Sequence, residues 1–174
     1  MNAIDIWFNQ QALILQNPLL NKIMIFITNI GSPESMAALS AILIVVLFFC
    51  KKKRHALLLI YTMSTGVILM SLTKLIVQRE RPENAIINAA GYSFPSGHAT
   101  ASIIFFSLLI YAFKNDIKNK LLKNLFIAAN ITLFILIGFS RIYLNVHWFT
   151  DVVTGYAFGV LVLTAFFCLF PRIK

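Results

Sequence analysis

The strongest candidates for chemistry in this sequence are a histidine and a carboxylate near the C-terminal end. His147 and Asp151 are four residues apart, so they would share one face of a helix. A carboxylate at that spacing can accept the Nδ1–H of the imidazole, which fixes the tautomer and leaves Nε2 free as a nucleophile. A lone pair of this kind is usually a structural hydrogen bond, but Asp151 is the only carboxylate in the last 58 residues and begins an apolar run. The pair is therefore a candidate for nucleophilic catalysis.

A second histidine, His98, follows a turn-forming segment. Pro95, Ser96 and Gly97 precede a run of small and then apolar residues, which indicates the start of a helix. We expect a Ser near the first turn to cap this helix and Gly97 to let the backbone approach a ligand closely. The unpaired amides and the positive dipole end of a first turn favour an anion, and His98 would be directed at it.

Lys74 and Arg81 supply positive charge just before this segment. They are seven residues apart, which on a helix places them within about 20° of one face, two turns apart. Both side chains could therefore reach the same anion, and Pro82 is expected to end the helix near Arg81. Arg79 lies off that face. We expect it to pair with Glu80 or with water, which makes it a secondary candidate.

The composition indicates that these residues are held in a membrane. Of the 174 residues, 59% are hydrophobic and 12% are charged, and the mean hydropathy is +0.83. Soluble proteins carry about 25% charged residues, so an ordinary soluble domain and a disordered chain are both excluded. The net charge of +9 does not indicate nucleic-acid binding, because the cations are separated by long apolar runs instead of lying along one polar face.

Apolar runs predict an all-α, polytopic membrane helix bundle in a single domain, residues 1–174. A span needs roughly 20 apolar residues, and five strong candidates follow one another: residues 35–50, 56–77, 99–113, 121–139 and 152–170. Residues 1–16 are amphipathic and predict an interfacial helix, and residues 19–30 predict a sixth, weaker span. Gly31 to Glu34 would make a tight reversal into the next span. The expected architecture is five to six transmembrane helices plus the N-terminal interfacial helix.

The loop charges orient this bundle. Ten of the 15 Lys and Arg residues lie at residues 51–54, at residues 114–123 and at the C-terminal end, as Arg172 and Lys174. These segments alternate along the chain, so they share one face, which the positive-inside rule makes cytoplasmic. Ionisable side chains at the opposite, outer edge mark functional sites, and four further cations lie there: Lys74, Arg79, Arg81 and Arg141.

In these segments the chain resembles the integral-membrane type-2 phosphatidic acid phosphatase superfamily. The family signature has three parts, Lys-x6-Arg-Pro, Pro-Ser-Gly-His and Ser-Arg-x5-His-x3-Asp, and all three occur here in order. They are Lys74 to Pro82, Pro95 to His98 and Ser140 to Asp151. The signature region is therefore about residues 74–151, and the resemblance extends over roughly residues 60–165. Because three motifs with fixed spacing match, a chance resemblance is very improbable.

The resemblance implies a role for each motif residue. His147 would attack phosphorus to form a phosphohistidine while Asp151 orients it, and His98 would protonate the leaving oxygen and help to activate the hydrolytic water. Five groups would hold the phosphate oxygens: Lys74, Arg81, Ser96, the amide of Gly97 and Arg141. Members of this family work without a metal, and the chain lacks the carboxylate cluster that a Mg²⁺ site would need. We therefore predict no metal site and no cofactor.

We expect a lipid phosphatase of the outer leaflet, because the predicted site lies at the outer membrane edge between apolar helices. Undecaprenyl diphosphate is the favoured substrate, with lipid A 1-phosphate close behind and phosphatidylglycerol phosphate or phosphatidic acid as further candidates. The predicted partners are the phosphorylated lipid and the bilayer, without nucleic acid or an obligate protein partner. The expected location is the bacterial cytoplasmic (inner) membrane, with the active site on the extracytoplasmic face.

Two other functions remain open from the sequence. A lipid phosphotransferase would use the same histidine but pass the phosphoryl group to an alcohol. A non-enzymatic carrier for anionic lipids would use the outer cations only for attraction, although two histidines and a carboxylate exceed what attraction requires. Vanadate-dependent haloperoxidases share the signature, but they are soluble proteins, and this composition is that of a membrane protein.

Overall fold

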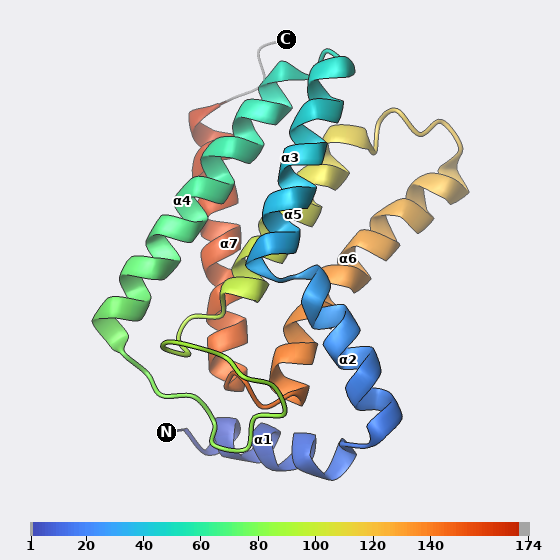
Figure 1. The fold of residues 1–174 in the computed structure, drawn as a ribbon. Coiled ribbons are helices and arrows are strands. Elements are labelled where there is room, and N and C mark those ends of the chain that lie inside the picture. The colour runs from blue at the N-terminus through green and yellow to red at the C-terminus, as the bar shows by residue number, and fades with distance from the viewer. Residues whose placement is uncertain (1, 171–174) are drawn as a thin grey trace.

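The computed structural model describes residues 2–170, so Arg172 and Lys174 lie outside the described residues. Within that range the regular elements are all helices, which confirms the predicted all-α class. Figure 1 shows them as a bundle, with the loop between α4 and α5 at one end. The helices are α1 (Ala3–Leu15), α2 (Pro18–Ile30), α3 (Pro33–Phe49), α4 (Lys53–Val77), α5 (Gly97–Phe113), α6 (Lys120–Tyr143) and α7 (Phe149–Leu169).

Helix α5 forms the centre of the bundle, since it packs against α3, α4, α6 and α7. Its sequence is apolar on every side, and residues such as Ile104 and Phe106 are buried in the main core. The outer helices instead expose large apolar side chains, among them Phe49 and Ile76, which are 85% and 82% exposed. An apolar surface of this kind is suited to lipid and not to water.

The membrane-spanning candidates among the described helices are α4, α6 and α7, which are long and apolar enough to cross a bilayer alone. Helices α2 and α3 pass the same test only together, as a pair bent by 48°, and α5 is apolar but has only 17 residues. The membrane helix bundle is thus confirmed, while the count of five to six spans stays a prediction.

The tight reversal predicted at Gly31 to Glu34 is wrong, because α2 and α3 differ in direction by only 48°. Ser32 Oγ accepts the amide of Ser35 at 3.2 Å, and Pro33 occupies the first position of α3. Only two residues, Gly31 and Ser32, therefore separate the two helices, and the new helix starts before the chain can turn back. This geometry favours one broken span, which places α1 at the end of the bundle opposite the residue 51–54 loop (Figure 1).

Helix α1 lies across the end of the bundle that holds the α4–α5 and α6–α7 loops (Figure 1). The ring of Phe8 stacks on Phe149 of α7 with centroids 4.1 Å apart, and Asn9 Nδ2 donates to Asn145 Oδ1 at 2.9 Å. Its outer side exposes Trp7, which is 55% exposed. Residues 1–16 thus form a helix with one docked side, and its position in the membrane interface stays a prediction.

Candidate active site

The N-terminal ends of α5 and α7 meet through hydrogen bonds. The amide of Ser96 donates to the carbonyl of Asp151 at 3.0 Å, and Thr100 Oγ1 donates to the carbonyl of Gly155 at 3.0 Å. This approach requires a residue without Cβ in α7, because a Cβ on Gly155 would lie 2.6 Å from the Ser96 carbonyl oxygen. The second and third motifs are thereby brought together.

His147 and Asp151 are in contact, but on different elements. His147 lies in the loop before α7, and its Nδ1 is 3.3 Å from Oδ2 of Asp151 in the first turn of that helix. Their side chains are only 3% and 0% exposed. Oδ2 also accepts the amide of Trp148 at 2.9 Å, which fixes the carboxylate. The predicted shared helix face is therefore wrong, since α7 begins only at Phe149, although the predicted contact forms.

Burial determines the charge of His147. The pKa of His147 is lowered to about 4, mainly because the side chain is removed from water. The hydrogen bond with Asp151 raises this pKa, and the positive charges of Arg141 and Arg81 lower it further. The imidazole is therefore neutral near pH 7. With Nδ1–H directed at the carboxylate, the lone pair is at Nε2, which is the nucleophilic form of the ring.

Arg81 lies at the other nitrogen of His147. Its Nη1 is 3.2 Å from Nε2 and donates to the carbonyl of Val146 at 2.6 Å. Nε and Nη2 donate to the carbonyls of Gly91 and Ala90 at 2.9 and 3.0 Å. Backbone carbonyls from two loops therefore hold the guanidinium against the nucleophilic nitrogen.

The shared helix face predicted for Lys74 and Arg81 is wrong. Helix α4 ends well before Pro82, because Gln78 takes the left-handed conformation, with φ 49°, and its amide donates to the Lys74 carbonyl. Arg81 therefore lies in the following loop. The two side chains still converge, since Lys74 Nζ donates to the Tyr92 carbonyl at 2.6 Å and Arg81 Nη2 reaches the same oxygen at 3.3 Å.

Ser96 occupies the N-cap position of α5 without capping it. Its hydroxyl makes no capping bond, is completely buried, and has no hydrogen-bond partner among residues 2–170. The predicted cap is therefore wrong. A buried hydroxyl without a partner is rare in folded proteins, so this group is suited to bind a ligand. The next residue, Gly97, has Met70 beside it, with the Met70 Cε 3.1 Å from where a Cβ would lie.

His98 and Arg141 adjoin the same region. His98 is half-buried in the first turn of α5, close enough to Arg141 and His147 to interact with them electrostatically. Arg141 is 5% exposed; its Nη1 donates to Thr28 Oγ1 at 2.6 Å, and its Nε has no partner in the described part of the chain. Gly31 lies beside His98, because an added Cβ would be 3.3 Å from the imidazole Cδ2. The three motifs converge, and α2 and the break after it contact two of their residues.

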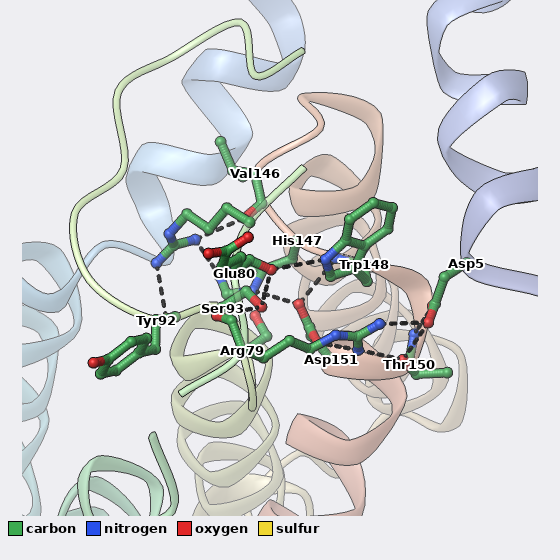
Figure 2. A network of polar contacts seen from close by, with 12 residues as sticks. Asp5, Arg79, Glu80, Tyr92, Ser93, Val146, His147, Trp148, Thr150 and Asp151 are labelled. Atoms are coloured by element: carbon green, nitrogen blue, oxygen red, sulfur yellow. Dashed lines mark hydrogen bonds and ion pairs between the residues drawn. The ribbon is translucent and has the colours of Figure 1, made fainter. Parts of the chain in front are cut away.

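The loop between α4 and α5 is fixed to the loop before α7. The amide of Ser93 donates to the Arg79 carbonyl at 2.8 Å, and Trp148 Nε1 donates to the Glu80 carbonyl at 2.9 Å. Figure 2 shows these residues grouped around His147. Besides the contacts of Arg81, the backbone of Glu80 thus helps to hold the first motif beside the third.

Arg79, which the sequence ranks as secondary, bridges two buried carboxylates (Figure 2). Its Nη1 donates to Asp151 Oδ1 at 2.7 Å, and its Nη2 donates to Asp5 Oδ2 at 2.6 Å. The predicted pairing with Glu80 does not form. Sequence reasoning missed Asp5 entirely, although a carboxylate in an apolar helix is a signal by itself, because such a group requires a partner.

Asp5 keeps its charge despite its position. Burial alone would raise its pKa, but hydrogen bonds from the Thr150 amide, from Arg79 and from the Thr150 hydroxyl outweigh burial and leave the pKa below its ordinary value. The Asp5 carboxylate therefore lies in its charged form beside Arg79, which also contacts Asp151.

The described residues contain no group of three or more His, Cys, Asp and Glu side chains that could hold a metal ion. Cys50 and Cys168 are free and exposed. The predicted independence from a metal or another cofactor stays a prediction.

Comparisons with known proteins agree with the motifs and the geometry. The model of the PAP2 superfamily matches residues 55–174. Phosphatidylglycerophosphatase B of Bacillus subtilis (strain 168) is 29% identical over 164 residues, which cover 92% of this chain and 80% of that protein. The crystal structure of a transmembrane PAP2-type phosphatidylglycerolphosphate phosphatase from Bacillus subtilis superposes with a TM-score of 0.85 at 26% identity, covering 100% of this chain and 90% of that one.

Aquifex aeolicus LpxE has the same fold, with a TM-score of 0.77 at 22% identity over 94% of each chain. The family model spans well over half of this sequence, including the whole signature region. The chain therefore belongs to the PAP2 superfamily, the type-2 phosphatidic acid phosphatases that its three motifs resemble.

Proposed function

We propose that this membrane lipid phosphatase acts through a phosphohistidine formed on His147. The observation that carries the proposal is the position of the imidazole between two opposite charges. Nδ1 is 3.3 Å from Asp151 Oδ2, and Nε2 is 3.2 Å from Arg81 Nη1. The carboxylate would stabilise the positive charge that the ring acquires on attack, and the guanidinium lies where a phosphate must approach Nε2.

The reaction would proceed in two steps. In the first, Nε2 of His147 bonds to phosphorus while the bond from phosphorus to the leaving oxygen breaks, and a protonated His98 gives its proton to that oxygen and becomes neutral. In the second, His98 takes a proton from water, and the resulting hydroxide breaks the N–P bond and releases inorganic phosphate. Both steps need the negative charge on the phosphoryl oxygens to be stabilised.

Two buried groups are suited to that task, because neither has a partner among residues 2–170: Ser96 Oγ and Arg141 Nε. A phosphate between them would satisfy both, which offsets the cost of leaving them unpaired. The remaining groups proposed to hold the phosphate are Lys74, Arg81 and the Gly97 amide.

We propose that the hydrocarbon tail of the substrate enters between α4 and α5, where a small apolar groove has a cavity volume of about 10 Å³. Its walls include Met63, Gly66 and Met70 from α4, and Gly97, Ala101 and Ile104 from α5. Because Gly97 also belongs to the proposed phosphate site, a tail in this groove would bring its phosphate to His147. The end of the bundle that holds the site is opposite the residue 51–54 loop (Figure 1), which by the positive-inside rule supports a substrate in the outer leaflet of the bacterial cytoplasmic membrane.

Phosphatidylglycerol phosphate is the first substrate to test. A relative that aligns with 92% of this chain bears the name phosphatidylglycerophosphatase B. Undecaprenyl diphosphate, which the sequence favours, is the second. Lipid A 1-phosphate and phosphatidic acid complete the panel.

The test is phosphate release from this panel by the purified protein in detergent, with EDTA in one arm. We expect release to persist in EDTA and to fall by roughly 10³-fold or more in His147→Asn, since removal of a nucleophile leaves only residual catalysis. Lys51→Gln, in the remote basic loop, is the control and should retain activity. Substantial turnover by a folded His147→Asn would contradict the nucleophile assignment.

The same assay separates the two alternatives. A phosphotransferase would give phosphorylated acceptor alcohol in place of free phosphate. A carrier would release no phosphate and would still move lipid in the His147→Asn variant. The contact of Nδ1 with Asp151 favours the phosphatase, because anion attraction does not require an oriented imidazole.

A further inference from the structure

Asp5 is a buried carboxylate that belongs to none of the three motifs. It lies in the first turn of α1, and its side chain is 0% exposed. Oδ1 accepts the amide of Thr150 at 2.9 Å, and Oδ2 accepts Arg79 Nη2 at 2.6 Å. Since Thr150 is in the first turn of α7, a side chain of α1 caps the helix that carries Asp151.

Arg79 extends these contacts from Asp5 to Asp151. Its Nη1 donates to Asp151 Oδ1 at 2.7 Å, so that Oδ2 is left for the His147 Nδ1 and the Trp148 amide. Figure 2 shows Arg79 between the two carboxylates, with Thr150 beside it. Each oxygen of Asp151 therefore has a separate role: Oδ1 is held by the guanidinium, and Oδ2 orients the imidazole.

The charges of this cluster determine how strongly Asp151 can act on His147. Asp151 and Arg79 alone would form a neutral pair, whereas Asp5 adds a negative charge and leaves the cluster negative overall. The imidazole becomes positive when its Nε2 bonds to phosphorus, and a negative neighbour stabilises that charge. We propose that Asp5 and Arg79 are positioning residues that fix Asp151 and keep a net negative charge beside the nucleophile. This inference rests on the proposed role of His147.

Docking of α1 does not by itself require a buried carboxylate. The same helix is held by the stack of Phe8 on Phe149 and by the hydrogen bond from Asn9 to Asn145. Apolar packing generally stabilises a fold at least as well as a buried ion pair of similar size. Docking of α1 therefore does not account for the choice of a carboxylate at this position.

The first test compares Asp5→Asn with Phe8→Ala. Asp5→Asn keeps the shape of the side chain and removes its charge, and we expect kcat to fall about tenfold with KM changed by less than about twofold, as for outer partners of a functional histidine. Phe8→Ala removes the ring stack and leaves every charge in place. It should lower the unfolding temperature in detergent but keep kcat at temperatures well below unfolding. Equal losses of kcat in the two variants would overturn the inference.

The second test asks whether kcat of the double variant Asp5→Asn with Arg79→Gln is higher or lower than kcat of Asp5→Asn. The single variant leaves Arg79 and Asp151 as a neutral pair, and removing the guanidinium as well restores a net negative charge at Asp151. We expect the double variant to recover kcat by about threefold relative to Asp5→Asn, a non-additive result. Two contacts that only dock α1 would give the reverse, so a double variant less active than the single one would contradict the proposal.

A third measurement is independent of the substrate. The chain has three histidines, so protein labelled with 15N-histidine gives a simple imidazole NMR spectrum in which His147→Asn identifies the His147 signals. We expect the Nδ1–H proton to lie downfield in the wild type, to move upfield in Asp5→Asn, and to stay in place in Phe8→Ala. An unchanged resonance in Asp5→Asn would overturn this inference, whereas a wild type that releases no phosphate from any lipid would overturn the proposed function alone.

Discussion

The amide of Ser96 donates to the carbonyl of Asp151 at 3.0 Å, so the start of α5 and the start of α7 are joined backbone to backbone. One turn further along α7, Gly155 faces the Ser96 carbonyl oxygen, which would lie 2.6 Å from an added Cβ. The distance between the second and third motifs therefore depends on a glycine that belongs to neither.

Gly155→Ala should separate the two helices. The added Cβ has backbone on the opposite side and cannot be accommodated by a rotamer change, so we expect a loss of about 1–3 kcal/mol in stability. Phosphate release should fall about tenfold or more, because a displacement of about 1 Å in a site is costly. Thermal unfolding and phosphate release in detergent measure both effects. Ala157→Val, on the exposed side of α7, is the control, and equal behaviour of the two variants would refute the packing argument.

Ser96→Ala should affect activity without affecting stability. Its hydroxyl has no partner within residues 2–170, so its removal breaks no hydrogen bond of the fold. If it binds phosphate, kcat/KM should fall by about 10- to 100-fold, since a hydrogen bond to a charged group contributes about 1.5–3 kcal/mol.

The control for this prediction is Ser102→Ala in the same helix. Ser102 Oγ donates to the Ala99 carbonyl at 3.2 Å, so its loss should cost about 1 kcal/mol of stability and leave kcat/KM unchanged. A stability loss in Ser96→Ala without an activity loss would show that the hydroxyl serves the fold and not the ligand.

The site could be predicted from the sequence where residue type and spacing act locally. His147 and Asp151 lie four residues apart and meet even though the helix begins between them. Lys74 and Arg81 converge on the Tyr92 carbonyl although the helix that was expected to carry both ends at Val77. The motif spacing therefore predicts which residues are in contact better than it predicts the helices that carry them, because a loop can bring the same residues together.

The contacts that the sequence did not predict are long-range. Asp5 meets Arg79 across 74 positions, and Thr28 meets Arg141 across 113. No local period or spacing identifies such partners, since tertiary packing alone brings them together. The bend after Gly31 was missed for a related reason: turn residues indicate a break in a helix, but the direction of the chain after the break is set by what the next helix packs against.

The pH profile should report the lowered pKa of His147. Burial is the main cause that brings this pKa to about 4, so the nucleophile stays neutral at pH values where an ordinary histidine, with a pKa of about 6.5, is protonated. We expect the acid limb of kcat/KM near pH 4, because kcat/KM reports groups of the free enzyme. An acid limb near 6.5 would mean that Asp151 outweighs burial.

The same shift predicts a pH dependence of stability. Between about pH 4 and the ordinary histidine value near 6.5, the unfolded chain binds a proton at this residue and the folded chain does not. Stability therefore rises with pH across that window, and is lost as pH falls through it. His147→Asn lacks this contribution, so the unfolding temperature of the wild type relative to the variant should fall from neutral to acidic pH. A constant difference would contradict the assigned shift.

The position of α1 makes the orientation of the whole bundle testable. In a background with Cys50→Ser and Cys168→Ser, single cysteines at Gln10, Asn88 and Lys118 would each lie on an exposed position. We expect an impermeant maleimide to label the first two on intact cells, and the third only after permeabilisation.

Labelling at Gln10 is the informative measurement, because its result distinguishes a topology of five spans from one of six. Five spans, with α2 and α3 as one bent span, place Gln10 on the same side as Asn88, whereas a reversal after α2 would place it on the opposite side. The ion pair of Asp5 with Arg79 requires the first arrangement, since a bilayer cannot lie between two groups 2.6 Å apart. Labelling of Gln10 only after permeabilisation, with Asn88 labelled on intact cells, would therefore contradict both the bent span and the role inferred for Asp5.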